Sequence, residues 1–205
     1  GCYGSGIIFM PKKANLKSEI KNLFEEVSGE LNLSVLGWRK VPVDAQAIGD
    51  LSKSTMPEII QIFISDKNFS NSTDFEKKLF VLRKIVENRL NANNISSDAQ
   101  KNFYICSLSC RTLIYKGLFT PEQLELFYPD LCQEDLISGF SMVHARFSTN
   151  TLGTWKLAHP YRYVVHNGEI NTVRGNRNWM KAREASLSKN HLTEYFPELF
   201  PICED

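Results

Sequence analysis

An arginine next to a cluster of hydroxyl side chains is the first feature of this chain that could bind a small acid. Arg146 follows the β-rich run 140–143 and precedes the hydroxyl-rich stretch 148–151. A guanidinium presents its N–H donors as a planar fork, which matches the two oxygens of a carboxylate. The position of Arg146 therefore predicts a carboxylate clamp, whereas a surface ion pair is its ordinary alternative.

An Asn-Gly turn lies further along the chain and predicts a different chemistry. Asn167-Gly168 follows the β-rich run 163–166. Glycine permits a tight turn in which its N–H points out of the strand, and the Asn side-chain NH2 can point to the same place. Two convergent neutral donors form an oxyanion hole for an amide carbonyl that becomes tetrahedral. The same dipeptide is also the strongest short signal for a plain hairpin, so both interpretations stay open here.

The strings around these residues resemble a known family. HNGEINT at 166–172 is followed by GNRNW at 175–179, and RFSTNT occupies 146–151. Together they are similar to the class II glutamine amidotransferases and, within them, to the glutaminase domain of glutamate synthases. Shorter matches to that group are spread over the chain, at 35–44, 56–63, 103–108, 115–118 and 127–131.

The resemblance implies an N-terminal-nucleophile hydrolase fold. That fold is an α+β, four-layer αββα sandwich of two antiparallel sheets between helices. Residues 1–205 would form an incomplete copy of it, as one partial glutaminase domain. The mixture of helix and strand signals along the chain also favours α+β over a parallel wound sheet.

The resemblance also assigns roles to individual residues. Asn167 and Gly168 become the catalytic oxyanion donors, and Arg146 binds the α-carboxylate of the substrate glutamine. Phe147 and Thr149 line the pocket, with ordinary strand packing as the alternative for both. His166 is interpreted as a structural residue, because the family's base is the terminal amine of its nucleophile.

The nucleophile is where this sequence departs from the family. The family uses an N-terminal cysteine, whose thiol attacks glutamine while its own α-amino group moves the protons. Here Gly1 precedes Cys2, and Tyr3 stands where the family has glycine. Residues 3–12 look instead like an internal strand, so we expect the chain to have little glutaminase activity alone. Two alternatives stay open: a complete amide hydrolase that uses Cys2 after removal of Gly1, and a non-catalytic glutamine-binding module.

The resemblance implies partners and cofactors only for a longer enzyme. Ammonia would pass from this domain to a synthase domain. There, FMN and an iron–sulfur cluster would serve the reduction of its adduct with 2-oxoglutarate to glutamate. None of these cofactor sites is expected in the present segment, which also does not reveal whether the electron donor is nicotinamide or ferredoxin. The predicted location is the cytoplasm, or a plastid if the donor is ferredoxin.

Composition limits the other classes of function. The chain has 205 residues, of which 42% are hydrophobic, and a formal net charge of +1. Balanced charge argues against nucleic acid or an acidic membrane as a partner, and no apolar run approaches the roughly 20 residues of a membrane span. No second Cys or His pair follows Cys106 and Cys110 at zinc-like spacing, so no metal site is predicted. Cys106 is expected to pack as a small apolar residue.

Periodicity and turn residues predict the elements that must position these motifs. Buried strands are expected at 7–9, 35–38 and 59–64, and a hairpin at 103–108 and 112–115. TDFE at 73–76 is typical of a capping box that opens a helix, and TPEQ at 120–123 is a second cap signal. A further helix is expected after Asn176. Helical spacing predicts two apolar faces, one of Leu16, Ile20, Leu23, Phe24 and Val27, the other of Phe75, Leu79, Leu82 and Val86.

Overall fold

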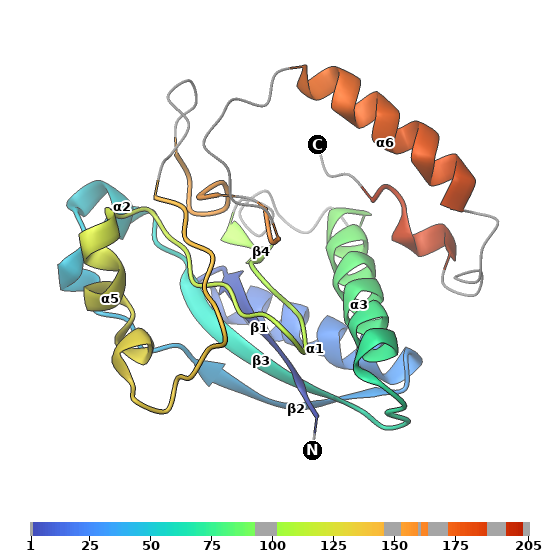
Figure 1. Cartoon of the computed structure of the whole chain (residues 1–205), viewed down its shortest axis with the longest axis horizontal. Helices are drawn as coiled ribbons and strands as arrows, with labels where there is room; N and C mark the ends of the chain where they lie inside the picture. The colour runs from blue at the N-terminus through green and yellow to red at the C-terminus, as the bar shows by residue number, and fades with distance from the viewer. Residues whose placement is uncertain are drawn as a thin grey trace.

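Four antiparallel strands form the single sheet in the part of the chain that the structure describes. The computed structural model describes residues 2–92, 102–145, 153–159, 161–163, 172–187 and 196–202. The sheet has the order β2-β3-β1-β4 (Figure 1). Its strands are β1 (Gly4–Met10), β2 (Leu33–Lys40), β3 (Glu58–Asp66) and β4 (Tyr104–Ile105). The strands predicted at 7–9 and 59–64 are confirmed as parts of β1 and β3.

Strand β1 lies inside the sheet and is buried on both faces. It pairs along its whole length with β3, from Gly4 opposite Ile64 to Met10 opposite Glu58. Successive side chains of a strand point to opposite faces, so Ile8 and Met10 enter one hydrophobic cluster while Ile7 and Phe9 enter another. The sheet therefore needs a covering layer on each side.

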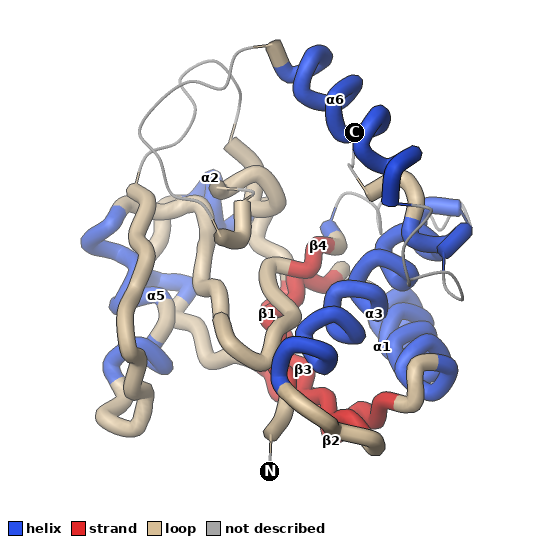
Figure 2. The backbone as a smooth tube through the Cα atoms, turned by 45° about the vertical axis from the view of Figure 1, so that its right-hand side comes forward, coloured by secondary structure: helices blue, strands red, loops and turns tan. Residues whose placement is uncertain are grey.

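Two long helices cover the first face. They are α1 (Ala14–Glu30) and α3 (Ser72–Ala92), and Figure 2 shows them side by side against the strands. The predicted apolar faces of both helices are confirmed. Most of their residues are buried in the hydrophobic cluster that also holds Ile8 and Met10, and Leu23 is partly buried against it. The buried residues are Ile20, Phe24 and Val27 of α1, with Leu16 also buried, and Phe75, Leu79, Leu82 and Val86 of α3.

Short helices and connecting segments cover the opposite face (Figure 2). The layer includes η1 (Ala45–Ala47), α2 (Asp50–Ser54), η2 (Pro121–Gln123), α5 (Leu124–Phe127) and η3 (Pro129–Cys132). Aromatic rings fill it. Phe127 lies 4.7 Å from Tyr128 and 5.6 Å from Trp155, centroid to centroid, and Trp155 lies edge-on to Phe9 at 5.7 Å. A second sheet is not among the described residues, so one sheet and one layer of long helices are observed, and the four-layer sandwich stays a prediction.

The predicted hairpin at 103–108 and 112–115 is wrong. Only Tyr104–Ile105 forms a strand, and it pairs with β1, with Ile8 opposite Ile105 and Phe9 opposite Tyr104. Beyond it, the Ser107 hydroxyl accepts hydrogen bonds from the backbone N–H groups of Ile7 and Ile114, both at 3.3 Å. The Ser107 hydroxyl thus accepts hydrogen bonds in place of the backbone carbonyls of a hairpin. Strand propensity could not reveal this substitution.

Two other predictions need smaller corrections. The strand predicted as buried at 35–38 is the edge strand β2, where Leu36 is 61% exposed and the register with β3 shifts between Val35 and Gly37. Helix α3 begins at Ser72, and Asn71 caps it by accepting from the N–H of Asp74 at 2.9 Å. Glu76, assigned by the sequence to a capping box, has other partners. The capping box of Thr120 and Gln123 is confirmed.

The last described elements are α6 (Val173–Leu187) and η4 (Phe196–Leu199). The predicted helix after Asn176 thus begins earlier, at Val173, and Trp179 on it is 78% exposed. In contrast, η4 packs on α3: Leu199 is buried, and the Asn88 side chain donates to the Glu198 carbonyl at 2.8 Å. Among the described helices, none is long and apolar enough to cross a membrane.

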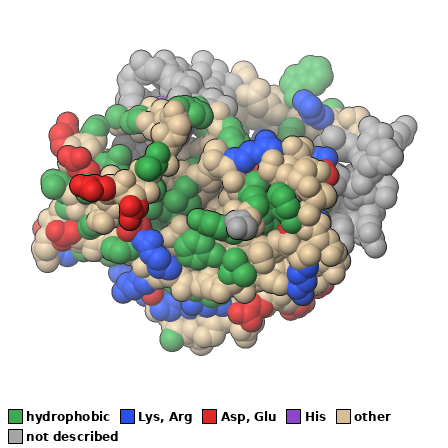
Figure 3. Space-filling model, turned by 60° about the horizontal axis from the view of Figure 1, so that its bottom comes forward, with side chains coloured by type: hydrophobic (Ala, Val, Ile, Leu, Met, Phe, Trp, Pro, Cys, Tyr) green, Lys and Arg blue, Asp and Glu red, His purple; other side chains and the backbone are tan. Residues whose placement is uncertain are grey.

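Charged side chains of both signs share the molecular surface. On the face seen in Figure 3, acidic and basic side chains are both present, and hydrophobic side chains lie between them. Arg89 of α3 illustrates the pairing, because it contacts Glu26 and Glu30 of α1 and Glu198 of η4. The hydrogen bonds that Arg89 donates to Glu30, and then to Glu198, raise the pKa of Arg89. The ion pairs therefore tie three helical elements together at their ends.

The close approach of β1 to residue 107 gives a test of the fold. A Cβ at Gly6 would lie 2.1 Å from the Ser107 carbonyl oxygen, whereas a Cβ at Gly37 would meet nothing within 4 Å. We expect Gly6→Ala to lower the free energy of unfolding by about 1–3 kcal/mol or more, because backbone must move apart. Gly37→Ala, the matched control, should change it by less than about 1 kcal/mol. Equal denaturation midpoints for the two variants would contradict the described packing.

Candidate functional site

The residues that the sequence assigns to the site lie outside the described part of the chain. This holds for Arg146, Phe147 and Thr149, and for Asn167 and Gly168. The structure does describe the segments that lead up to both motifs, namely 141–145, 153–159 and 161–163. The contacts of these three segments establish how the approaches to the site are held.

Two histidines bring the approaches to the two motifs together. His144 lies two residues before Arg146, and His159 lies in the segment that leads towards the Asn-Gly turn. Their imidazole rings stack with centroids 4.1 Å apart and an interplanar angle of 4°. Both side chains line a cavity of about 220 Å³, together with Met142 and Ala145. Sequence spacing gave no reason to pair these two histidines.

The segment 153–159 is fastened to the sheet. Trp155 is buried in the aromatic layer, and its indole N–H donates to the Ser52 carbonyl at 3.0 Å. The Lys116 ammonium donates to the Lys156 carbonyl at 2.8 Å and lies 3.9 Å from the centre of the Tyr104 ring of β4. A cation over an aromatic face is attracted by the ring's negative surface. This segment is therefore held next to the β4 edge of the sheet.

Arg162 holds the next segment to the same edge. Its guanidinium donates to the Ile105 carbonyl of β4 at 2.6 Å and lies 5.2 Å from the centre of the Tyr104 ring. The same group lies 3.6 Å from a carboxylate oxygen of Glu87, which is on α3 and buried. Arg162 thus joins the edge strand to the helical layer.

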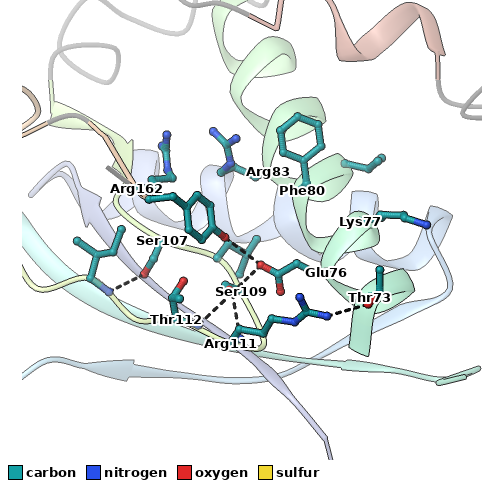
Figure 4. A pocket seen from close by; sticks show the side chains of 14 residues that line it. Thr73, Glu76, Lys77, Phe80, Arg83, Ser107, Ser109, Arg111, Thr112 and Arg162 are labelled. Atoms are coloured by element: carbon teal, nitrogen blue, oxygen red, sulfur yellow. Dashed lines mark hydrogen bonds between the residues drawn. The ribbon is translucent and has the colours of Figure 1, made fainter. Parts of the chain in front are cut away.

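Tyr163 makes a second connection to α3. Its hydroxyl donates to Oε1 of Glu76 at 3.0 Å. The same oxygen accepts from the Ser109 hydroxyl at 2.6 Å, and Oε2 accepts from the backbone N–H of Cys110 at 2.9 Å. Figure 4 shows Glu76 reaching from the helix towards Ser109. The carboxylate therefore joins α3 to two segments that are remote from it in sequence.

These contacts surround a cavity of about 480 Å³. Side chains of α3, of the segment 107–114 and of residues 162–163 line it (Figure 4). Its charged groups contact other protein groups. Arg83 donates to both carboxylate oxygens of Glu87, at 3.2 and 3.1 Å, and Arg111 donates to the hydroxyl of Thr73 at 2.8 Å.

Hydrogen bonding determines the ionisation of Glu76. Burial by itself would raise the pKa of this carboxyl, but the bonds from Ser109 and from the N–H of Cys110, with a smaller effect from Tyr163, outweigh it and lower the pKa. Glu76 is therefore ionised at neutral pH, and its hydrogen bonds are charge-assisted.

The cysteines differ in exposure and in pKa. Cys106 is buried, as the sequence predicts, and burial raises its pKa to about 12. Burial and a hydrogen bond to Glu76 raise the pKa of Cys110 to about 11. Neither thiol suits a nucleophile at neutral pH, because the thiolate is the reactive form. Cys2 and Cys132 are exposed. Within the described residues, no three His, Cys, Asp or Glu side chains form a group that could hold a metal ion.

The sequence analysis missed the residues that anchor this region. Glu76 matched a capping signal, and Arg162 and Tyr163 belonged to no motif. The contact between Glu76 and Tyr163 spans 87 positions. The only signal that pointed to Tyr163 was its place four residues before Asn167.

The chain belongs to the class-II glutamine amidotransferases, because residues 1–205 match the model of that family. Glutamate synthases are among its relatives. It is 42% identical over 201 residues to the NADPH glutamate synthase large chain of Bacillus subtilis, a match that covers 98% of this chain and 13% of that protein. It is 40% identical over 214 residues to the NADH glutamate synthase of Saccharomyces cerevisiae, covering 100% of this chain and 10% of the relative.

A chloroplastic ferredoxin-dependent glutamate synthase of Oryza sativa is 44% identical over 184 residues, which cover 90% of this chain and 11% of the relative. The chain thus spans about a tenth of the length of the curated relatives that it matches. The resemblance to the family, first noted from the two motifs, is confirmed over the whole chain.

The lowered pKa of Glu76 gives a prediction for stability. A carboxyl whose pKa is lower in the folded state stabilises that state above its unfolded pKa, near 4.5 for glutamate, and this contribution is lost as pH falls through the folded value. Glu76→Gln should therefore lower the free energy of unfolding most at pH 7 and least at pH 3. Chemical denaturation of both proteins at the two pH values measures this difference. An equal difference at both would show that the charge of Glu76 is irrelevant.

Proposed function

We propose that this chain supplies the glutamine-binding and amide-polarising part of the glutaminase site of a glutamate synthase. The observation that carries the proposal is the match to class-II glutamine amidotransferases over residues 1–205, because it includes both predicted motifs. The reaction is hydrolysis of glutamine to glutamate and ammonia. We also propose that the chain has the four-layer sandwich of its family, with a second sheet beyond the one described.

Arg146 would bind the α-carboxylate of glutamine. A bidentate guanidinium fixes the orientation of a carboxylate as well as its position, so the side-chain amide is presented in one direction. Phe147 and Thr149 would line the same pocket, the latter through its hydroxyl. This clamp is remote from the reacting carbonyl and should act mainly on substrate binding.

Asn167 and Gly168 would polarise that carbonyl. Attack on the amide carbon converts the carbonyl oxygen into an oxyanion, and two N–H donors aimed at its position stabilise the tetrahedral state. Both donors are neutral and fixed, so they need no proton transfer of their own. The stacked pair His144 and His159 supports the proposal, because it brings the approaches to the two motifs into contact.

The similarity of this segment to its relatives does not depend on the electron donor for which they are named. The relatives named for NADPH, NADH and ferredoxin lie between 39% and 44% identity. Such even similarity fits a segment that handles glutamine while the redox steps take place elsewhere. The ammonia would pass to a synthase domain, for which FMN and an iron–sulfur cluster are expected. The cytoplasm, or a plastid for a ferredoxin-dependent enzyme, is the expected location.

The oxyanion role of Asn167 can be tested in a full-length glutamate synthase that carries this segment. Asn167→Ala should lower kcat for glutamine hydrolysis by roughly 100- to 1000-fold, which is the usual effect of removing one oxyanion donor. The KM for glutamine should change little. Steady-state ammonia release measures both constants.

Arg146→Lys in the same enzyme provides the contrast. Lysine keeps the charge but loses the two-pronged geometry, so KM should rise while kcat at saturation is nearly retained. The proposed site is refuted if Asn167→Ala folds and turns over at a near-normal rate. A large fall in kcat at constant KM for Arg146→Lys would remove its role as a clamp.

The role of Cys2 needs a separate experiment on the chain itself. While Gly1 is attached, the nitrogen of Cys2 is an amide and cannot accept a proton as a terminal amine does. We expect the 205-residue chain to release no measurable ammonia from glutamine, and a chain that begins at Cys2 to behave alike. Circular dichroism and a cooperative unfolding transition serve as folding controls. Ammonia release that Cys2→Ser abolishes would establish the alternative hydrolase.

A further inference from the structure

We propose that helix α6 of one chain docks on an acidic surface of a second copy of the same chain. The basic side chains of α6 and its exposed Trp179 form one half of the contact. The other half is the acidic surface, which consists of Glu122, Glu125, Glu134 and Asp135 with the exposed Leu126 and Ile137. The inference is independent of glutamine hydrolysis, because neither half contains a residue assigned to the proposed site.

The formal net charge of +1 conceals two segments of opposite sign. Residues 117–145 hold five acids and neither lysine nor arginine. Helix α6 holds one acid, Glu184, and four basic residues, which are Arg174, Arg177, Lys181 and Arg183. Surfaces of opposite potential steer association and fix the register of a contact. The two segments are therefore complementary to each other.

Helix α6 makes little use of the hydrophobic core. None of its described side chains is buried, whereas α1 and α3 each bury an apolar face. On the side towards the rest of the chain, Met180 and Glu184 are partly buried, and Glu184 accepts from the backbone N–H of Ile202 at 2.7 Å. A helix of 15 residues is marginal in water without packing. Contact with a second surface would therefore stabilise α6.

Trp179 lies on the outward side of α6. An α-helix turns by about 100° per residue, so Trp179 is about 140° around the axis from Glu184. Its side chain is 78% exposed, and Gly175 and Ala182 beside it on the helix are small. The exposed Arg183 follows one turn later. Tryptophan and arginine are the residues most enriched among those that carry the binding energy of interfaces.

Short helices bring the acidic surface together. Glu122 lies in η2 and Glu125 in α5, which follows directly. The Cys132 thiol at the end of η3 donates to the Glu125 carbonyl at 3.8 Å, so the chain returns to α5 just before Glu134 and Asp135. Figure 3 shows acidic side chains gathered at the end of the molecule where α5 lies, with hydrophobic side chains between them.

The apolar part of this surface is also exposed. Leu126 is 60% exposed and Ile137 is 89% exposed, and both lie next to acids in the sequence. An indole that meets these side chains would be surrounded by carboxylates, which the guanidinium of Arg183 can bind with two parallel hydrogen bonds. Asp130 is excluded from the surface because Arg39 pairs with it.

One chain cannot form this contact by itself. Helices α5 and α6 lie on opposite sides of the molecule in both Figure 1 and Figure 2. A second copy carries both halves, so each chain can offer α6 to a neighbour and its acidic surface to another α6, which is a heterologous contact. Helix α6 is only about 22 Å long, so the contact is small and we expect association in the micromolar range.

The test is sedimentation velocity of the 205-residue chain from about 10 to 500 μM, where the wild type should self-associate. Reversal of the basic half, by Lys181→Glu with Arg183→Glu, should weaken association roughly tenfold or more. Reversal of the acidic half, by Glu125→Lys with Glu134→Lys, should do the same. Circular dichroism and a cooperative unfolding transition show that each variant folds.

A matched control separates the contact from net charge. Glu19 and Glu25 are exposed on α1, and Glu19→Lys with Glu25→Lys gives the same net charge as reversal of the acidic half. This variant should associate within about threefold of the wild type, because both halves of the contact are intact. Trp179→Ala should weaken association about tenfold or more, as the loss of a central aromatic anchor does.

A charge swap identifies the partner. The two reversed variants should associate when they are mixed, although neither does so alone, because each then offers the complement of the other. All four substitutions in one chain restore the net charge of the wild type and should restore its self-association. Rescue of this kind requires that α6 and the acidic surface meet.

Four results would overturn the inference. The first is a wild-type chain that is monomeric at about 500 μM. The second is an equal loss of association in the α1 control, which would attribute the effect to net charge. The third is a failure of the charge swap to rescue association. The fourth is a monomeric chain that binds vesicles of phosphatidylserine through α6, which would assign the helix to a membrane surface instead.

Discussion

The burial of β1 on both faces is the constraint on which the rest of the structure depends. Ile8 and Met10 on one side and Ile7 and Phe9 on the other are removed from water, and each contributes about 1.5–3 kcal/mol through burial. A strand of this kind cannot lie at a surface. It requires long helices over one face and an aromatic layer over the other. The segments that lead to the proposed site are then held by contacts with these two layers.

Helix α3 combines two tasks on different sides of its surface. Its apolar side covers the sheet through residues such as Phe75 and Leu82, while Glu76 and Glu87 contact Tyr163 and Arg162. The two acids are eleven positions apart, about 16 Å along a helix, so the helix works as a rigid spacer between two attachment points. Core packing and the attachment of residues 162–163 therefore depend on one helix but use different side chains of it.

The β4 edge is where the fold and the proposed chemistry meet. Tyr104 lies under both Lys116 and Arg162, which hold 153–159 and 161–163 respectively. The stacked imidazoles of His144 and His159 connect this edge to the approach to Arg146. Membership of the class-II glutamine amidotransferases supports the proposed chemistry. The contacts show how 153–159 and 161–163, which lie outside regular strands, are held at the sheet.

The sequence by itself determined the family, the two inner strands and the apolar faces of both long helices. Sequence motifs and hydrophobic periodicity are local properties, so they are readable along the chain. Prediction from the sequence failed where a side chain formed the hydrogen bonds expected of other groups. The Ser107 hydroxyl accepts from Ile114 where a hairpin was expected, and Asn71 caps the helix where Thr73 was expected to do so. Only the tertiary structure decided that Glu76 holds Tyr163, because a hydrogen bond across 87 positions leaves no local pattern.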